Sequence, residues 1–300
     1  MEKGRGRTGR GLTVFEAGML IVLQSLVYGF GDPISKIAFE IVPVYSMMTV
    51  RYSIAFLFCA AIFGKRIVNT VKSVPLKSWL IPGLCIGMSY VFNNIALDLT
   101  EATSVAFLRS LAVVITPALA FIAFRKKYRW QHIAAQILVL PGMYLLCVRG
   151  GLSGFGSGEI MALLAALLVA ATLVFTGKFI EQVDPVSMTA LQAGCSAVIA
   201  LAGSLIVEKG VHVSSATPKA WLIILYLAIL CTFLGYLLQN LALTRISDRE
   251  VSLIQSLNPV MTAGFAFILL GEKLSAAGIA GAAIIIACIS VSALIKDEGN

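Results

Sequence analysis

The residues most able to do chemistry in this chain are polar side chains that lie inside long apolar runs. They are two tyrosines, an acid, an arginine and six carboxamides: Tyr28, Asp32, Tyr90, Asn93, Asn94, Arg109, Gln239, Asn240, Gln255 and Asn258. Charged groups are expensive at membrane depth, so we expect these side chains to face protein or a water-filled cavity. Such groups recognise a small solute by charge and hydrogen bonding, and we predict that they form its binding site.

Motifs typical of enzymes and ATP-driven pumps are missing from the sequence. It has no Gly-rich nucleotide loop ending in Lys-Ser or Lys-Thr, and no His/Glu or Asp-rich metal motif. The six cysteines lie in apolar runs without metal-ligand spacing, and we interpret them as small buried hydrophobes. We therefore expect no cofactor, no metal and no catalysis. The alternatives from other classes are a membrane scaffold and an integral-membrane enzyme acting on a lipid or isoprenoid substrate.

Transmembrane helices must position these side chains. Hydrophobic residues make up 59% of the 300 positions and charged residues 13%, against roughly 45–50% and 25% in soluble domains. Ten apolar runs approach the roughly 20 residues that a spanning helix needs. They are Thr13 to Lys36, Tyr45 to Gly64, Ser78 to Leu97, Thr103 to Phe124, Gln131 to Val148, Gly158 to Phe179, Ser187 to Val207, Ala220 to Leu243, Val251 to Leu270 and Ala276 to Ile295. The alternation of an outer-membrane barrel is absent, so we predict an all-α integral membrane protein with ten transmembrane helices.

The basic residues predict the orientation of these helices. A net charge of +8 is compatible with nucleic-acid binding, but the charges gather in alternate loops, as the positive-inside rule requires. The three clusters are Lys3, Arg5, Arg7 and Arg10; Lys65, Arg66, Lys72 and Lys77; and Arg125, Lys126, Lys127 and Arg129. We expect a multi-pass protein of the inner (plasma) membrane with both termini cytoplasmic, surrounded by lipid and without a nucleic-acid partner.

An internal repeat divides the chain into two halves. Two displacements align the sequence with itself, one of 146 residues and one of 142 residues. The aligned pairs include Phe92–Leu97 with Leu238–Leu243, Arg109 with Gln255, Lys36 with Lys178 and Pro43 with Pro185. Each half holds five predicted helices, and because five is odd the second half enters the membrane from the opposite side. We predict two inverted repeats, residues 1–150 and 151–300, with a solute held between them near the midplane.

Short motifs accompany the repeat. They are Tyr28-Gly29 followed by Lys36, Pro43 followed by Arg51-Tyr52, the stretch Ser252–Val260, and Gly271–Leu274. In these motifs the chain resembles the EamA family of the drug/metabolite transporter superfamily. The resemblance implies a ten-helix fold with cytoplasmic termini and a central cavity lined mainly by helices one, three, four, six, eight and nine. It also implies export of amino acids or other metabolites.

Several polar side chains have two readings at this stage. Arg51 can extend to the outer surface or pair with Asp32 or Asp98, and Arg109 can meet a substrate carboxylate or satisfy helix-end carbonyls. The carboxamides can bind a zwitterionic solute or hold helices together. If transport is coupled to protons, Asp32 is the best candidate for the titrating acid; it can instead cap a broken helix, and facilitated diffusion needs no such group.

A proline predicts a break in the ninth run. Pro259 cannot donate a backbone hydrogen bond, so the carbonyl of Gln255 is expected to be free for a ligand. Taken together, the sequence predicts a secondary transporter that exports small organic metabolites, amino acids or related compounds, by alternating access. It leaves open the solute, the coupling ion and whether two copies form a homodimer.

Overall fold

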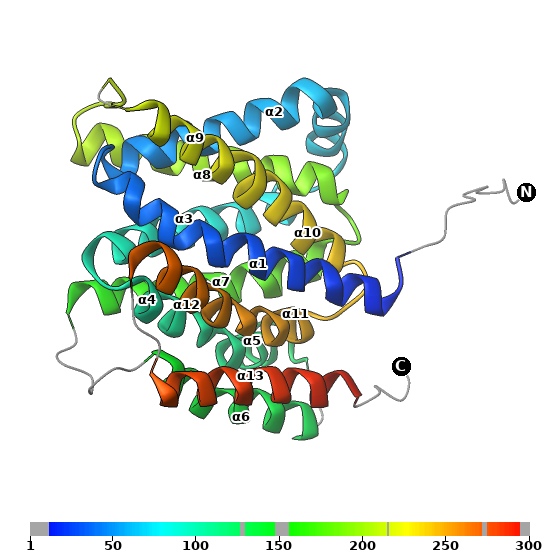
Figure 1. The fold of residues 1–300 in the computed structure, drawn as a ribbon. Coiled ribbons are helices and arrows are strands. Elements are labelled where there is room, and N and C mark those ends of the chain that lie inside the picture. Colours follow the sequence, from blue (N-terminus) through cyan, green and yellow to red (C-terminus); the bar gives the residue numbers. More distant parts are fainter. Residues whose placement is uncertain (1–11, 127–129, 148–155, 215, 272–274, 295–300) are drawn as a thin grey trace, which may run out of the picture.

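Helices make up most of the part of the chain that the computed structural model describes, which is residues 12–126, 130–147, 156–214, 216–271 and 275–294 (Figure 1). They are α1 (Val14–Phe39), α2 (Val44–Ser73), α3 (Lys77–Leu99), α4 (Ala102–Ser110), α5 (Ala112–Phe124), α6 (Trp130–Cys147), α7 (Ser157–Phe179), α8 (Pro185–Val207), α9 (Pro218–Tyr226), the π-helix η1 (Leu227–Leu234), α10 (Gly235–Ala242), α11 (Asp248–Ile254), the 3₁₀-helix η2 (Gln255–Leu257), α12 (Asn258–Leu270) and α13 (Ala276–Leu294). No strand occurs in those ranges, so the all-α prediction is confirmed.

Some residues named above lie outside the described ranges. They are the basic residues before the first run, Lys127 and Arg129 after the fourth, residues 272–274 of the last motif, and the predicted boundary at residue 150.

Eight helical segments of the described chain are long and apolar enough to cross a membrane. Five are the single helices α1, α2, α3, α7 and α8, and three are the composite segments Ser104–Phe124, Pro218–Ala242 and Asp248–Leu270. The other two predicted runs correspond to α6 and α13, whose apolar stretches Gln136–Leu145 and Ala276–Val291 are shorter. The chain is therefore a multi-pass membrane protein with eight full-length candidate spans and two shorter apolar helices.

The surface of the bundle agrees with a lipid environment. Large apolar side chains are exposed over much of their area, including Phe15 (77%), Ile122 (73%), Ile206 (78%) and Ile268 (71%). Water would disfavour so many exposed apolar groups, whereas lipid tails solvate them.

The helices lie side by side in layers (Figure 1). The pair α6 and α13 forms one outer layer, α2 lies with α8 and α9 on the opposite side, and α1, α3, α7 and α12 pass between them. Close packing joins α2 to α8, α6 to α13, α1 to α12 and α3 to α7. The start of α1 and the end of α13 lie at the same end of the bundle (Figure 1).

Two spans are broken at equivalent points of the repeat. The α-helix is interrupted at Leu111 between α4 and α5, and by η2, which ends at Leu257, between α11 and α12. These two leucines are 146 residues apart, the displacement of the repeat. Both segments also end on a left-handed residue, Arg125 (φ 57°) and Gly271 (φ 68°), again 146 residues apart. The two halves therefore share these backbone features.

Helix α2 continues beyond the predicted end at Gly64. It bends at Phe63 (φ −118°, ψ 16°) and extends to Ser73 because Ile67 and Thr70 are buried against the bundle. The short connection to α3 then leaves little loop on this side.

Helices α2 and α8 are tied at both ends. At one end the Glu208 carboxylate accepts hydrogen bonds from the backbone N–H groups of Tyr45 and Ser46, each at 2.8 Å. At the other end Arg66 forms an ion pair with Asp184. The Glu208 contacts satisfy free amides at the start of α2 with a residue from the other half of the chain.

Candidate functional site

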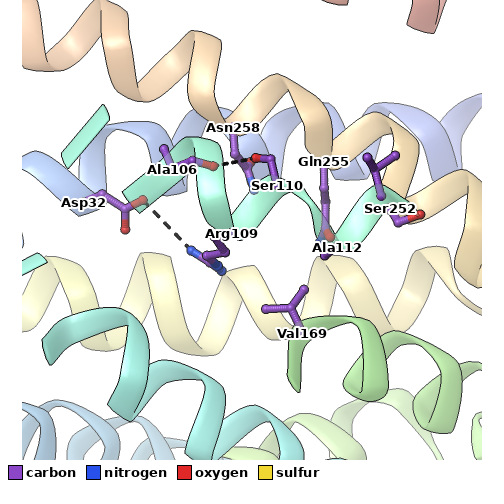
Figure 2. A pocket seen from close by; sticks show the side chains of 10 residues that line it. Asp32, Ala106, Arg109, Ser110, Ala112, Val169, Ser252, Gln255 and Asn258 are labelled. Atoms are coloured by element: carbon purple, nitrogen blue, oxygen red, sulfur yellow. Dashed lines mark hydrogen bonds and ion pairs between the residues drawn. The ribbon is translucent and has the colours of Figure 1, made fainter. Parts of the chain in front are cut away.

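An ion pair lies at the centre of the candidate site. The Asp32 Oδ2 atom on α1 is 4.0 Å from Nη1 of Arg109 on α4, and the side chains are 14% and 11% exposed (Figure 2). Arg109 lies two residues before the break at Leu111, inside the composite span Ser104–Phe124. The sequence predicted both residues as site residues, and the structure brings them together.

Arg51 is buried without forming an ion pair with another described residue. Its side chain is 4% exposed, and its Nε donates a 2.9 Å hydrogen bond to Oγ1 of Thr232. Of the two partners considered from the sequence, Asp98 is exposed and Asp32 pairs with Arg109. Thr232 is positioned by the π-helix η1, where its hydroxyl donates to the carbonyl of Leu227 five residues earlier (3.0 Å). Such π turns occur frequently at functional sites.

Tyrosine rings surround the two guanidinium groups. The Arg109 Cζ atom lies 5.0 Å from the Tyr90 ring centre and 5.8 Å from that of Tyr28. The Arg51 Cζ atom lies 5.1 Å from the Tyr52 ring and 5.8 Å from the Tyr90 ring. The electron-rich ring faces attract these cations and stabilise them away from water. Tyr28 and Tyr90 were predicted as site residues, and Tyr52 was not.

A carboxamide cluster joins three helical segments. Gln255 Nε2 donates to Oε1 of Gln24 and to Oε1 of Gln239, both at 2.9 Å, and Gln24 Nε2 donates to the carbonyl of Gly235 at 2.8 Å. Gln255 and Gln239 were predicted as site residues. Gln24 was missed, although a fully buried carboxamide in an apolar run is the signal that selected the others. The predicted freeing of the Gln255 carbonyl is wrong, because this carbonyl accepts a hydrogen bond from the backbone N–H of Asn258 in the 3₁₀ turn. The predicted break itself occurs there as η2.

The paired asparagines differ in their surroundings. Asn240 Nδ2 donates to Oγ1 of Thr189 (3.0 Å) and Oε1 of Gln192 (2.9 Å), both on α8. Asn94 Nδ2 donates to the carbonyl of Tyr90 in its own helix (2.7 Å). Asn93 is 1% exposed, and its Oδ1 has no hydrogen-bond partner among the described residues. Asn240 therefore joins two helices through its Nδ2 atom, although its Oδ1 atom, like that of Asn93, has no partner among the described residues.

Two small cavities meet at the ion pair. The first, of about 20 Å³, is lined by Asp32, Ala106, Arg109, Ser110, Ala112, Val113, Val169, Ser252, Gln255 and Asn258 (Figure 2). The second, of about 10 Å³, is lined by Tyr28, Gly31, Asp32, Ser35, Arg51, Tyr90, Asn93, Asn94, Arg109, Leu227 and Cys231. Eight of the ten predicted site residues line one or both; Gln239 and Asn240 line neither.

The cavity size identifies the state of the molecule. Each cavity has room for about one water molecule, whereas small-molecule sites are typically at least about 300 Å³. In this conformation the bundle is therefore closed around its polar centre. A larger hollow of about 490 Å³ lies between α5 and α6, but its lining is mainly apolar and it is away from the charged cluster.

Comparison with known proteins identifies the family. The model of the EamA-like transporter family matches residues 17–148 and, a second time, residues 156–294. The chain belongs to the EamA-like transporter family. This EamA chain is 24% identical over 278 residues to an uncharacterized transporter of Archaeoglobus fulgidus, covering 93% of this chain and 86% of the relative. It is also 26% identical over 289 residues to a probable amino-acid metabolite efflux pump of Salmonella typhimurium, covering 92% and 94%.

A solved crystal structure shares the fold of the EamA chain. The two superpose with a TM-score of 0.74 at 18% identity, covering 93% of this chain and 96% of the other. Together with the membrane-length helices, the family match makes this chain a transporter of the EamA type. The predicted family is confirmed.

Proposed function

We propose that this EamA transporter exports small organic metabolites, amino acids or related compounds, across the inner membrane by alternating access. The observation that carries the proposal is the buried cluster of Asp32, Arg109 and tyrosine rings, located where broken helices from both halves meet. Charged groups at this depth are expected where a solute or ion passes. The name of the Salmonella relative supports amino-acid metabolites as the solute class.

The packing supports an inverted repeat of two five-helix halves, residues 1–150 and 151–300. In a two-fold repeat, helices near the axis contact their counterparts in the other half. The second helices of the halves, α2 and α8, pack on each other, and so do the last helices, α6 and α13. Tyr90 and Tyr236, which are 146 residues apart, contact each other with ring centres 5.7 Å apart. With α6 and α13 counted as crossings the chain has ten spans, and the basic loops favour cytoplasmic termini.

The side chains take two roles in this proposal. Asp32, Arg109, Tyr28, Tyr90, Asn93, Asn94, Gln255 and Asn258 contact the solute when the closed cavities enlarge. Gln239 and Asn240 hold the helices that carry them, through their hydrogen bonds to neighbouring spans. The transporter names of the relatives favour this function over an enzyme acting on lipid or isoprenoid substrates.

Counterflow in liposomes tests the proposal. Vesicles with purified protein are loaded with one unlabelled amino acid and placed in its labelled form, and we expect label to accumulate inside. Arg109→Ala should lose accumulation, whereas Gly264→Ala should keep it because no atom lies within 4 Å of the added Cβ. If amino acids, nucleosides, sugars and polyamines all fail to exchange in folded wild-type protein, the proposed function is wrong.

A further inference from the structure

The charges at the centre of the bundle do not balance. The two guanidinium groups of Arg51 and Arg109 and the single carboxylate of Asp32 all line the same small cavity. Asp32 pairs with Arg109, and the described part of the chain places no carboxylate within 4.0 Å of Arg51. One buried positive charge is therefore balanced only by a hydroxyl and two ring faces. Burying an uncompensated charge is unfavourable, so such a site favours an anion.

The Asp32 and Arg109 contact leaves room for a competing acceptor. Its 4.0 Å separation is longer than the roughly 2.7–2.9 Å of a charge-assisted hydrogen bond. The same guanidinium donates a 3.3 Å hydrogen bond from Nη2 to the Tyr90 hydroxyl and otherwise contacts the Tyr28 and Tyr90 ring faces. A carboxylate entering the cavity can therefore gain shorter bonds from Arg109 than Asp32 provides.

A neutral acceptor completes the site. The Asn93 Oδ1 atom is buried, lines the same cavity and has no partner among the described residues. A buried acceptor without a partner is unfavourable, and an N–H or O–H group of a ligand would satisfy it. This adds a second, uncharged feature to the ligand that fits.

We propose that the solute carries a carboxylate and a net charge of −1, with a neutral hydrogen-bond donor beside it, as in an N-acylated amino acid or a hydroxy acid. Arg51 and Arg109 bind the carboxylate, and Asn93 accepts the bond from the donor. A zwitterionic amino acid satisfies the same arginines but leaves the positive charge of the site unbalanced, so it binds less tightly. The inference rests on the proposed function, since it takes this cavity as the solute site.

Binding of three compounds on one small scaffold tests the charge. Full-length protein in lipid nanodiscs is titrated calorimetrically with N-acetylalanine, alanine and alaninamide, whose net charges are −1, 0 and +1. We expect N-acetylalanine to bind about tenfold more tightly than alanine, the effect of 1.4 kcal/mol, and alaninamide to bind most weakly. Equal affinity for the first two compounds, or no binding of N-acetylalanine at millimolar concentration, overturns the inference.

Two variants move the charge in opposite directions. Arg51→Gln removes the unbalanced charge and should abolish the preference for N-acetylalanine over alanine, whereas Arg51→Lys should retain part of it. Asp32→Asn removes a negative charge, so the site becomes more positive and the preference for N-acetylalanine over alanine should increase. Because two variants are used, the test does not depend on one of them folding. A preference unchanged in both Arg51→Gln and Asp32→Asn contradicts the assignment.

Asn93 has its own comparison, since lactate has a hydroxyl beside its carboxylate and propionate has none. Wild-type protein should bind lactate more tightly than propionate, and Asn93→Ala should bind the two equally. If Asn93→Ala prefers lactate as strongly as the wild type does, Asn93 is not part of the site.

Counterflow of the same compounds separates this inference from the proposed function. Protein that exchanges alanine and binds it as tightly as N-acetylalanine is a transporter without this selectivity. Protein that binds the series in the expected order but exchanges none of it has the carboxylate site without the proposed transport.

Discussion

The two halves of the chain build the same backbone frame but contribute different chemistry to the centre. All three charged side chains of the cluster come from the first half, and the aligned positions of the second half are uncharged. The pairs are Asp32 with Val174, Arg51 with Ala193 and Arg109 with Gln255. The broken spans and their left-handed ends, by contrast, recur in both halves. The repeat therefore duplicates the helices but not the charges. Only one set of costly buried charges lies between the two halves.

The largest expected effect comes from the aligned pair of Arg109 and Gln255, which differs by a charge. Arg109→Ala removes the ion pair and both ring contacts, and we expect counterflow to fall about 100-fold, since a hydrogen bond to a charged group contributes about 1.5–3 kcal/mol. Gln255→Ala, its counterpart, should reduce counterflow only a few-fold by the same measurement. Equal losses of counterflow in the two variants would show that both halves contribute equally to transport, contrary to the difference described above.

The first helices of the halves differ in how closely they pack. A Cβ at Gly29 would lie 2.3 Å from Cβ of Met261 on α12, whereas the aligned position in α7 already holds Ala171. Gly29→Ala should therefore destabilise the protein by about 1–3 kcal/mol, as overpacking does. A thermal melt in detergent measures this as a lower Tm. Gly264→Ala, which meets nothing within 4 Å, is the control, and an equal Tm for the two variants would contradict the packing argument.

The aligned asparagines should separate stability from transport. Asn240→Ala removes two hydrogen bonds to α8, and we expect a loss of about 1 kcal/mol, at roughly 0.6 kcal/mol for each interhelical bond. Asn94→Ala removes a hydrogen bond within its own helix, so it should reduce counterflow while changing Tm little. Melting and counterflow of both variants check this, and the reverse pattern would exchange the two roles.

The smallest effect concerns the ends of the broken spans. Arg125 adopts the left-handed conformation that Gly271 adopts in the second half, and this conformation costs a non-glycine residue about 1 kcal/mol. Arg125→Gly should therefore raise Tm slightly. Arg125→Ala removes the same charge but keeps the backbone strain, so it should give no increase; a similar increase in both would attribute the effect to charge.

The sequence predicted the parts of the site that depend on composition. Polar residues in apolar runs have few places to lie, so Asp32 and Arg109 were expected to face protein or a cavity, and both do. The same rule also selects Gln24, which was omitted although it is fully buried. The helical runs themselves followed from length and apolar content, apart from the extension of α2 and the shorter apolar stretches of α6 and α13.

Hydrogen-bond partners that are positioned by irregular backbone could not be predicted from the sequence. Arg51 bonds to Thr232, whose position is set by the π-helix η1, and no proline or glycine pair in the sequence marks that turn. The break at Leu111 precedes Pro117 by a full turn and more, so the proline alone does not locate it. These features depend on packing between distant segments, which periodicity and composition do not encode.

The ties between α2 and α8 limit how the molecule can change shape. Glu208 and the pair of Arg66 with Asp184 fasten a helix of one half to a helix of the other at opposite faces of the membrane. A rigid-body movement of one half relative to the other would have to break both the Glu208 hydrogen bonds and the ion pair of Arg66 with Asp184. We therefore expect α2, which carries Arg51, and α8 to move together as one unit, while α1 and α4, which carry Asp32 and Arg109, change position relative to it.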